Sequence, residues 1–524
     1  MTTSERALRL GIVLVGLQAA LALAAYFQVH RMALAHTVRV YAEAAPLPGA
    51  TWPVRVSVID EAARRPAAWD SAELVARTPE GREARVALAP DGGATSEAVA
   101  NVLALSLPSE IEVHVEGAGS EALRVSGRVS DAAWPHALAS DDALSRSSTQ
   151  RRPDLGGEGD QPRVWVRRAS DACPMVLSVV ANGGVVARDL DNRVWLRLTH
   201  PDGAPAAGVA LEIQPHDAGD PAPEAPAPTD TLGVAEVALR PLVAGSWSVR
   251  WSCGGVQAER RVSWVPSWDG IVLQMHSPHV PFGRSLTLEA SHQRGFGRWY
   301  VDVRCDGRWT MTGSEAVEQG TRRMSLPLGL GEPAPHPLWC TVSGTTIPLS
   351  PDPPRGQTHA LILPAGASLT EVLGEVAGAY RAHAPDPIAQ QLEPPTLAAL
   401  ERASQEELDR FASWLVHAMP YVYEPPPLWT DSGPAAREAL AATRAGRLRA
   451  LAVTLAVDFA VLLAFVLGIV LPRARRERAQ LESLYAGELV SGAPATRPWL
   501  VLALGVGVLV ASGLGIVALL SVLG

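Results

Sequence analysis

The sequence contains no lysine, so all 45 of its basic residues are arginine. Without a lysine amine the chain cannot form a Walker A phosphate loop, a protein-kinase ATP site or a pyridoxal Schiff base. It also lacks the His-Glu-x-x-His, Gly-x-Ser-x-Gly, Cys-x-x-Cys and Gly-x-Gly-x-x-Gly segments that mark common catalytic or cofactor sites. The net charge of −9 argues against a nucleic-acid binder. We therefore expect no enzyme, no catalytic or metal-binding residues, no cofactor and no nucleic-acid partner. The sequence does not identify a small-molecule ligand.

Three apolar windows are long enough, at 1.5 Å per residue, to cross a hydrocarbon core of about 30 Å: residues 10–29, 450–471 and 499–523. The first is read as a transmembrane helix; the alternative is a cleaved signal peptide ending near Ala22-Leu23-Ala24. Arginines in residues 1–9 and in the loop 472–498 predict that both segments are cytoplasmic. These readings predict a bacterial inner-membrane protein with a large periplasmic domain.

Polar and small residues interrupt these windows. Asp458 and Gln18 are intramembrane polar residues in this reading, and a buried carboxylate there suggests an ion or proton pathway, a local hydrogen bond or a charge partner. The last window carries small residues at every fourth position, a stripe that favours close helix packing: Ala503, Gly507, Ala511 and Gly515.

The four cysteines all lie between the first two apolar windows. Four cysteines allow three pairings, of which we favour Cys305–Cys340 and Cys173–Cys253; four free thiols are the alternative. Cys305 and Cys340 each fall on the alternating positions of a strand that face the core, so their bridge is expected to cross between two sheets. Disulfides indicate an oxidising compartment, and the absence of an Asn-x-Ser/Thr sequon favours a bacterial periplasm.

Alternation of apolar and polar residues dominates from residue 38 to about 350, as in Val54, Val56 and Val58. The pattern predicts three β-sandwiches over 38–130, 163–265 and 268–350, with a polar linker at 145–162.

Several aromatic and polar residues within these sandwiches are open to a functional interpretation. Trp247 and Trp251 lie on the inward face of their strand, whereas Trp195, Trp299 and Trp309 are read as surface-facing and suggest a carbohydrate-binding or peptide-binding surface. Two further groups could hold metals but are more typical of loops and turns: His276 with His279, and Asp189 with Asp191 and Asn192.

Residues 355–447 change to helical periodicity, and Ser404 with Glu407 has the spacing of a capping box. We read this segment as a small helical membrane-proximal module, either a stalk packed on the third sandwich or a docking helix for a partner, and favour the stalk. The predicted fold is mainly β: tandem Ig-like β-sandwiches with this helical module and three transmembrane α-helices.

Turn motifs in the second sandwich resemble those of bacterial macroglobulin-type Ig-like domains. The run Asn182-Gly183-Gly184, Asn192-Arg193-Val194 and Asp202-Gly203 with Pro205 is similar to their "GG … N-x-V … D-x-x-G-x-P" pattern. Thr229-Asp230 with Gly233 and Ala235 resembles their "T-D-x-x-G-x-A" turn. The resemblance covers about half the chain and implies an Ig-like fold. No Cys-Gly-Glu-Gln thioester segment is present, so covalent protease trapping is not implied.

Two functions fit these observations. The favoured one is a non-enzymatic, membrane-anchored periplasmic scaffold or binding protein that presents tandem Ig-like domains to an envelope protein. The alternative is a component of a membrane transport or energy-coupled complex that uses Asp458.

Overall fold

A computed structural model describes most of the chain. The described residues are 17, 19–30, 36–47, 50–61, 63, 65–77, 80–90, 98–102, 109–116, 123–129, 164–168, 173–184, 186–215, 226–264, 266, 271–292, 298–316, 320–330, 333–345, 356–383, 388–418 and 427–486. Contacts divide the chain into two compact units. The first comprises Met1–Thr37, Asp60–Arg64 and Gly433–Gly524, and the second comprises Val38–Ile59 and Arg65–Ser432.

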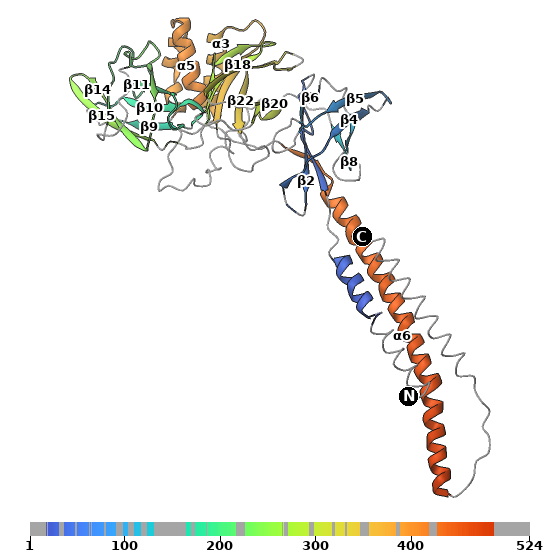
Figure 1. The fold of residues 1–524 in the computed structure, drawn as a ribbon. Helices are drawn as coiled ribbons and strands as arrows, with labels where there is room; N and C mark the ends of the chain where they lie inside the picture. The colour runs from blue at the N-terminus through green and yellow to red at the C-terminus, as the bar shows by residue number, and fades with distance from the viewer. Residues whose placement is uncertain are drawn as a thin grey trace. The chain divides into compact units, whose positions relative to one another are not determined.

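The first unit is built around the long helix α6 (Gly433–Ala486), coloured orange to red in Figure 1. Residues 19–30 form a second helix, in which Ala22 and Ala25 pack against Leu451 of α6. Small side chains at this contact allow the two helices to approach closely.

Within the described residues no helix is both long and apolar enough to cross a bilayer. The prediction of three transmembrane helices is therefore wrong, and the predicted inner-membrane localisation fails with it. The window 499–523 lies outside the described residues.

Sandwich 1 packs the sheet β24-β1-β2-β3, with β6 also paired to β2, against the sheet β5-β4-β7-β8. The alternating residues Val54, Val56 and Val58 of β2 meet Ile111 and Val113 of β7 in its core. Its strands are β1 (His36–Ala42), β2 (Trp52–Asp60), β3 (Arg65–Pro66), β4 (Ser71–Arg77), β5 (Glu83–Leu88), β6 (Ala98–Val102), β7 (Ser109–Glu116), β8 (Leu123–Val129) and β24 (Leu428–Asp431).

Strand β24 comes from a part of the chain that the sequence places in the helical module. It pairs antiparallel with β1, and the Trp429 ring meets Trp52 edge-on with centroids 5.5 Å apart. The Trp429 indole N–H donates to the Arg128 carbonyl at 3.1 Å. Sandwich 1 is therefore discontinuous in sequence and is completed by residues far from its other strands.

Sandwich 2 packs the sheet β13-β11-β10-β9 against the sheet β12-β14-β15. The disulfide Cys173–Cys253 joins the segment before β10 to the end of β14 and so ties the two sheets together. The elements are β9 (Val164–Arg168), β10 (Val176–Ala181), the short helix η2 (Asn182–Gly184), β11 (Asn192–Thr199), β12 (Glu212–Pro215), β13 (Val234–Leu239), β14 (Gly245–Cys253) and β15 (Val256–Trp264).

Sandwich 3 packs the sheet β16-β18-β21 against the sheet β17-β23-β22-β19-β20. The disulfide Cys305–Cys340 is present, but it joins directly opposed residues of neighbouring strands rather than two sheets. The alternation of residues along a strand shows which face of the sheet a cysteine occupies. It does not show whether the partner cysteine lies on the next strand of the same sheet or on the opposite sheet. The strands are β16 (Ile271–Met275), β17 (His279–Pro281), β18 (Leu286–His292), β19 (Arg298–Cys305), β20 (Arg308–Ala316), β21 (Gly320–Leu326), β22 (Leu338–Thr345) and β23 (Gly356–Leu363).

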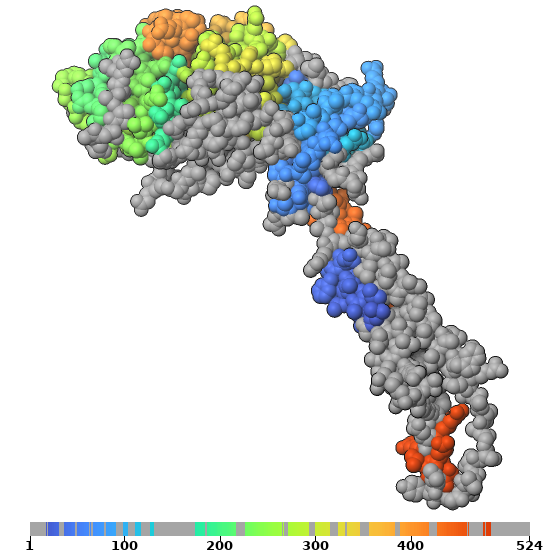
Figure 2. Space-filling view, in the orientation of Figure 1, coloured from blue at the N-terminus to red at the C-terminus, as the bar shows by residue number. Residues whose placement is uncertain are grey.

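The helical module comprises α3 (Leu369–His383), η3 (Ala389–Leu392), α4 (Pro394–Leu400) and α5 (Gln405–Ala418). It is not a stalk on one sandwich, because its core includes Val180 and Trp195 of sandwich 2 together with Leu361 of sandwich 3. All eight residues of β23 are buried, since the module covers the face that turns away from the sandwich core. Figure 2 shows the orange surface of the module between the green surface of sandwich 2 and the yellow surface of sandwich 3.

Candidate functional site: two buried polar joints

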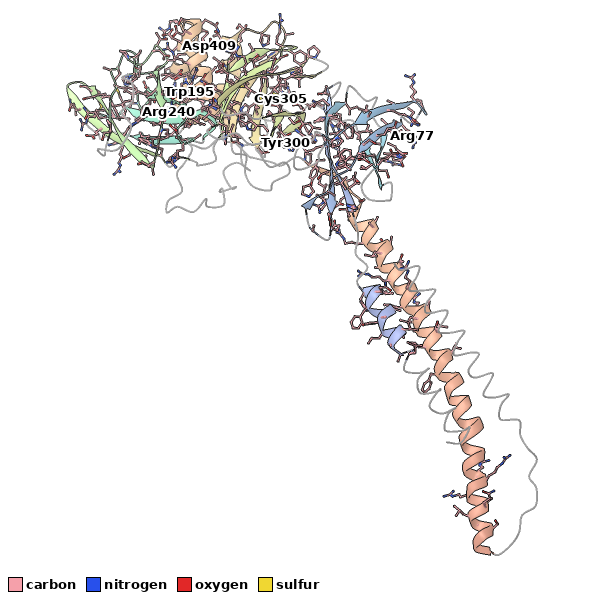
Figure 3. All side chains as sticks on the ribbon, viewed as in Figure 1. Arg77, Trp195, Arg240, Tyr300, Cys305 and Asp409 are labelled. Atoms are coloured by element: carbon pink, nitrogen blue, oxygen red, sulfur yellow. A yellow bond between two sulfur atoms is a disulfide. The ribbon has the colours of Figure 1, made fainter. Side chains whose placement is uncertain are left out.

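The first joint links sandwich 1 to sandwich 3 and is called the 1–3 joint. At its centre Arg55 of β2 donates to the Asp302 carboxylate at 2.7 Å and to the Thr312 hydroxyl at 2.9 Å. The Arg55 side chain is only 1% exposed. Its guanidinium also lies over the rings of Tyr300 and Trp309, at 5.2 and 5.8 Å from their centroids (Figure 3 labels Tyr300).

Further polar groups of the 1–3 joint bind the outer edge of β20. The Glu43 carboxylate accepts from the Trp309 backbone N–H at 2.9 Å and lies 3.7 Å from both Arg304 and Arg308. The Asn101 amide exchanges two hydrogen bonds with the backbone of Thr312, at 2.8 and 3.0 Å. The 1–3 joint thus consists of Glu43, Thr51, Arg55 and Asn101 on one side and Asp302, Arg304, Arg308, Trp309, Thr310 and Thr312 on the other.

The second joint links sandwich 2 to the helical module and is called the helix joint. Arg197 of β11 is fully buried and donates to the Leu232 carbonyl at 3.2 Å, the Gln391 carbonyl at 2.8 Å and the Thr396 hydroxyl at 2.7 Å. Burial lowers the pKa of Arg197 to about 9, so the guanidinium stays charged at neutral pH. Its flat faces pack on the rings of Trp414 and Phe411, which is a contact that arginine makes better than lysine.

The short helix η2 extends the helix joint to sandwich 3. Asn182 donates to the Leu273 carbonyl at 2.6 Å and accepts from the Thr358 hydroxyl at 3.3 Å. The next residue, Gly183, donates its N–H to His417 Nδ1 at 3.3 Å. Sandwich 2, sandwich 3 and α5 therefore meet at two consecutive residues of the Asn-Gly-Gly motif.

His417 is held as a neutral ring in this junction. Desolvation by burial lowers its pKa to about 3. Its ring stacks on Trp195, with centroids 5.0 Å apart and an interplanar angle of 12° (Figure 3 labels Trp195). A neutral imidazole is required here because Nδ1 must accept the Gly183 hydrogen bond.

The predicted capping box at the start of α5 is present and has a second role. Ser404 donates to Glu407 through both its backbone N–H and its hydroxyl, at 2.8 and 2.7 Å. Glu407 also accepts from the Thr231 backbone N–H of sandwich 2 at 3.0 Å. Partial burial acts to raise the pKa of Glu407, but the hydrogen bonds from Ser404 and Thr231 outweigh it and lower the pKa to about 2.

The tryptophans predicted to form a binding surface are buried instead. Trp195, Trp299 and Trp309 are 3%, 3% and 1% exposed. Trp195 lies beneath the helical module, Trp299 lies in the core of sandwich 3, and Trp309 lies in the 1–3 joint. The predicted carbohydrate-binding or peptide-binding surface is therefore wrong for these residues. The inward Trp247 and Trp251 are buried, as their parity predicts.

Three of the residues weighed as metal ligands, Asn192, Asp189 and His279, have structural partners. The Asn192 amide bonds the backbone of Ala187, Leu190 and Leu239 and so closes the turn before β11. Asp189 pairs with Arg240 at 3.1 Å, and His279 pairs with Asp409 of α5 at 2.8 Å (Figure 3 labels Arg240 and Asp409). Among the described residues no group of three or more His, Cys, Asp or Glu side chains is placed to hold a metal.

The remaining predicted positions are not described. The side chain of Asp458, Gln18 and the stripe Ala503, Gly507, Ala511 and Gly515 all lie outside the described residues. Conversely, the sequence did not identify Arg55, Arg197 or His417. For Arg55 and Arg197 the one signal was a charged residue between two core residues of a strand, which is also the pattern of a solvent-facing position, and His417 lies on the helix α5.

No protein-family model and no curated protein sequence matches the chain. Among solved structures, trypsin-activated alpha-2-macroglobulin from Escherichia coli is 12% identical over 63% of this chain, with a TM-score of 0.16. Dimeric latent PorU from Porphyromonas gingivalis is 11% identical over 63% of this chain and 34% of its own, with a TM-score of 0.20. The Escherichia coli adhesin FdeC is 11% identical over 64% of this chain and 98% of its own, with a TM-score of 0.15.

The chain spans 24% of the length of the Escherichia coli macroglobulin. Since every one of these TM-scores is far below 0.5, no functional statement is taken from the matches. The assignment of tandem β-sandwiches rests on the sheets and cores of the chain itself.

Proposed function

We propose that this protein is a non-enzymatic, extracytoplasmic scaffold that binds a protein partner through its tandem β-sandwiches. The observation that carries the proposal is the pair of buried polar joints. Arg55 and Arg197 are each enclosed by acceptors and aromatic rings from a neighbouring module. The helix joint holds sandwich 2, sandwich 3 and the helical module in one arrangement before any partner arrives, which reduces the ordering cost of binding over a large surface, and the 1–3 joint holds sandwich 1 in place while no partner is bound.

The two disulfides support the extracytoplasmic part of the proposal. Cys173–Cys253 and Cys305–Cys340 leave no free cysteine in the chain. Structural disulfides form and persist in oxidising compartments and are rare in the cytosol.

Affinity purification of the full chain from its native cells, followed by size-exclusion chromatography with light scattering, tests the proposal. We expect a partner at a fixed molar ratio. The variant Thr396→Val removes the hydroxyl that bridges Arg197 and the Gly203 carbonyl, so it should retain less partner. The control Thr443→Val removes a hydroxyl bonded only within α6 and should behave as the native chain does. A native chain that elutes as a lone monomer under all extraction conditions contradicts the proposal.

A further inference from the structure

The outer edge of β20 is bonded by side chains instead of a strand. In the sheet β17-β23-β22-β19-β20, β20 is the last strand, and within the described residues no further strand pairs with it. Sandwich 1 instead supplies hydrogen bonds to three residues along this edge. Glu43 accepts from the Trp309 N–H, Thr51 donates to the Thr310 carbonyl at 2.9 Å, and Asn101 bonds both backbone groups of Thr312.

These side chains reproduce what a neighbouring strand offers. In an antiparallel ladder a hydrogen-bonded residue exchanges one N–H···O and one O···H–N bond with its partner. The Asn101 amide makes that exchange with Thr312, at 2.8 and 3.0 Å. Asn101 lies on β6, which is itself at an edge, so the joint brings two sheet edges together without a backbone ladder.

The edge also has a charge preference. The carboxylate of Glu43 is surrounded by the Trp309 N–H and by the guanidinium groups of Arg304 and Arg308, each 3.7 Å away. An extended peptide that lay along β20 with a carboxylate at this position would satisfy the same three groups. Backbone hydrogen bonds would supply affinity, and the carboxylate would set its register.

Closing the 1–3 joint removes the charge of Arg55 from water, and opening the joint relieves this desolvation cost. Arg55 is buried with Asp302, yet its Nε has no hydrogen-bond partner among the described residues. A buried ion pair with an unsatisfied donor adds little to stability, because the desolvation cost offsets the attraction. Sandwich 1 is joined to sandwich 2 through residues 130–163 and to α5 through residues 419–427, and among the described strands none of sandwich 1 pairs with a strand of sandwich 3.

We propose that the β20 edge is a docking site for an extended, carboxylate-bearing segment of a partner protein, and that sandwich 1 occupies this edge until the partner displaces it. The inference rests on the proposed binding function and names the chemistry of its partner. The partner adds a strand to β20, places its carboxylate between Arg304 and Arg308, and leaves Arg55 free to return to solvent with sandwich 1.

The probe for this test is a fluorescent peptide with the sequence of residues 41–56, which contains Glu43, Thr51 and Arg55. It is added to the full chain, and binding is measured by anisotropy and by hydrogen exchange at the Trp309 and Thr312 amides. Arg55→Met in the full chain should open the joint, speed exchange at both amides and bind the peptide at least about tenfold more tightly than the native chain does. Peptide binding should then slow exchange at the same two amides.

Two matched changes locate the site. The peptide variant Glu43→Gln and the chain variant Arg55→Met with Arg308→Ala should each lose about tenfold in affinity, because each removes one side of the carboxylate contact. Near-ultraviolet circular dichroism confirms that each chain variant is folded. Should Arg55→Met leave the amides protected, Asn101→Ala with Glu43→Gln is tested in its place.

Protected amides in both opened variants overturn the proposal, as do exposed amides that the peptide fails to protect. Either result leaves the scaffold function standing if the native chain still copurifies with a stoichiometric partner, so the two failures can be told apart.

Discussion

The guanidinium of Arg197 lies 4.5 Å from the centre of the Trp414 ring while its nitrogens donate to three acceptors, two of them on the helical module. A fixed, planar donor is needed to meet acceptors in different directions and to stack on a ring at the same time. Lysine offers a single point charge on a flexible stem, so it cannot replace arginine here.

We therefore predict that Arg197→Lys and Arg197→Met both destabilise the chain, by about 3–5 kcal/mol, because buried carbonyl and hydroxyl groups lose their donor. Urea unfolding followed by tryptophan fluorescence measures the loss. The control is Arg323→Met, which removes an exposed pair with Glu289 at 2.9 Å and should cost under about 1 kcal/mol. An Arg197→Lys chain with native stability would show that the stacked, three-way geometry is unimportant.

The neutral His417 makes stability depend on pH. Its pKa is about 3 in the folded chain and about 6.5 when exposed, so between these values the unfolded chain binds more protons. Stability is then fully present above about pH 6.5 and falls as the pH drops, by up to about 1.4 kcal/mol per unit from this group.

Comparison with His417→Asn isolates this effect, because an amide oxygen can accept the Gly183 N–H without titrating. We expect the urea midpoint of the native chain to fall between pH 7 and 5 more steeply than that of His417→Asn. Measurements stop at pH 5 because Glu407, whose folded pKa is about 2, adds its own loss of stability only below its ordinary pKa near 4.5. Parallel curves for the two proteins would contradict the neutral-histidine interpretation.

Gly183 and Gly283 form a matched pair for testing the junction at η2. Both have positive φ, at 62° and 79°, so alanine is strained at either position. A Cβ at Gly183 would overlap the Gln357 carbonyl of β23, whereas a Cβ at Gly283 would meet open space.

Gly283→Ala should cost about 1–2 kcal/mol from backbone strain alone. Gly183→Ala should cost at least about 1–3 kcal/mol more, because sandwich 2 and sandwich 3 must also separate locally. Thermal unfolding of the two variants side by side measures the difference. Equal losses would mean that the contact between η2 and β23 is not tight.

Several features of the fold could be predicted from the sequence because they depend on local periodicity. The alternation of Val54, Val56 and Val58 identified a strand and its core face, and the spacing of Ser404 and Glu407 identified the start of α5. The favoured cysteine pairs are the two in the structure, because parity and proximity within one sandwich limit the choice.

The joints could not be predicted in the same way. The alternation of residues along a strand distinguishes the two faces of its sheet, but it does not show which part of the chain packs on the outer face. Arg197 and Trp195 have the parity of solvent-facing residues, yet the helical module buries both. Strand β24 was missed because four residues after a proline-rich segment carry too little pattern to signal a return to sandwich 1. Long apolar windows were read as membrane spans, an interpretation that the described helices do not support.

The two disulfides should differ in accessibility and in contribution to stability. Cys253 is half-buried at the end of β14, whereas Cys305 and Cys340 are both fully buried within sandwich 3. A reductant acting on the folded chain should therefore open Cys173–Cys253 first, and alkylation followed by mass spectrometry identifies the sulfurs released. Chain-entropy arguments also assign more stability to Cys173–Cys253, whose separation of 80 residues gives about 4.5 kcal/mol, than to Cys305–Cys340, whose separation of 35 gives about 3.8 kcal/mol. Paired Cys→Ala variants compared by urea unfolding test that order. If Cys305 and Cys340 were alkylated first in the folded chain, sandwich 3 would have to open more readily than its buried core implies.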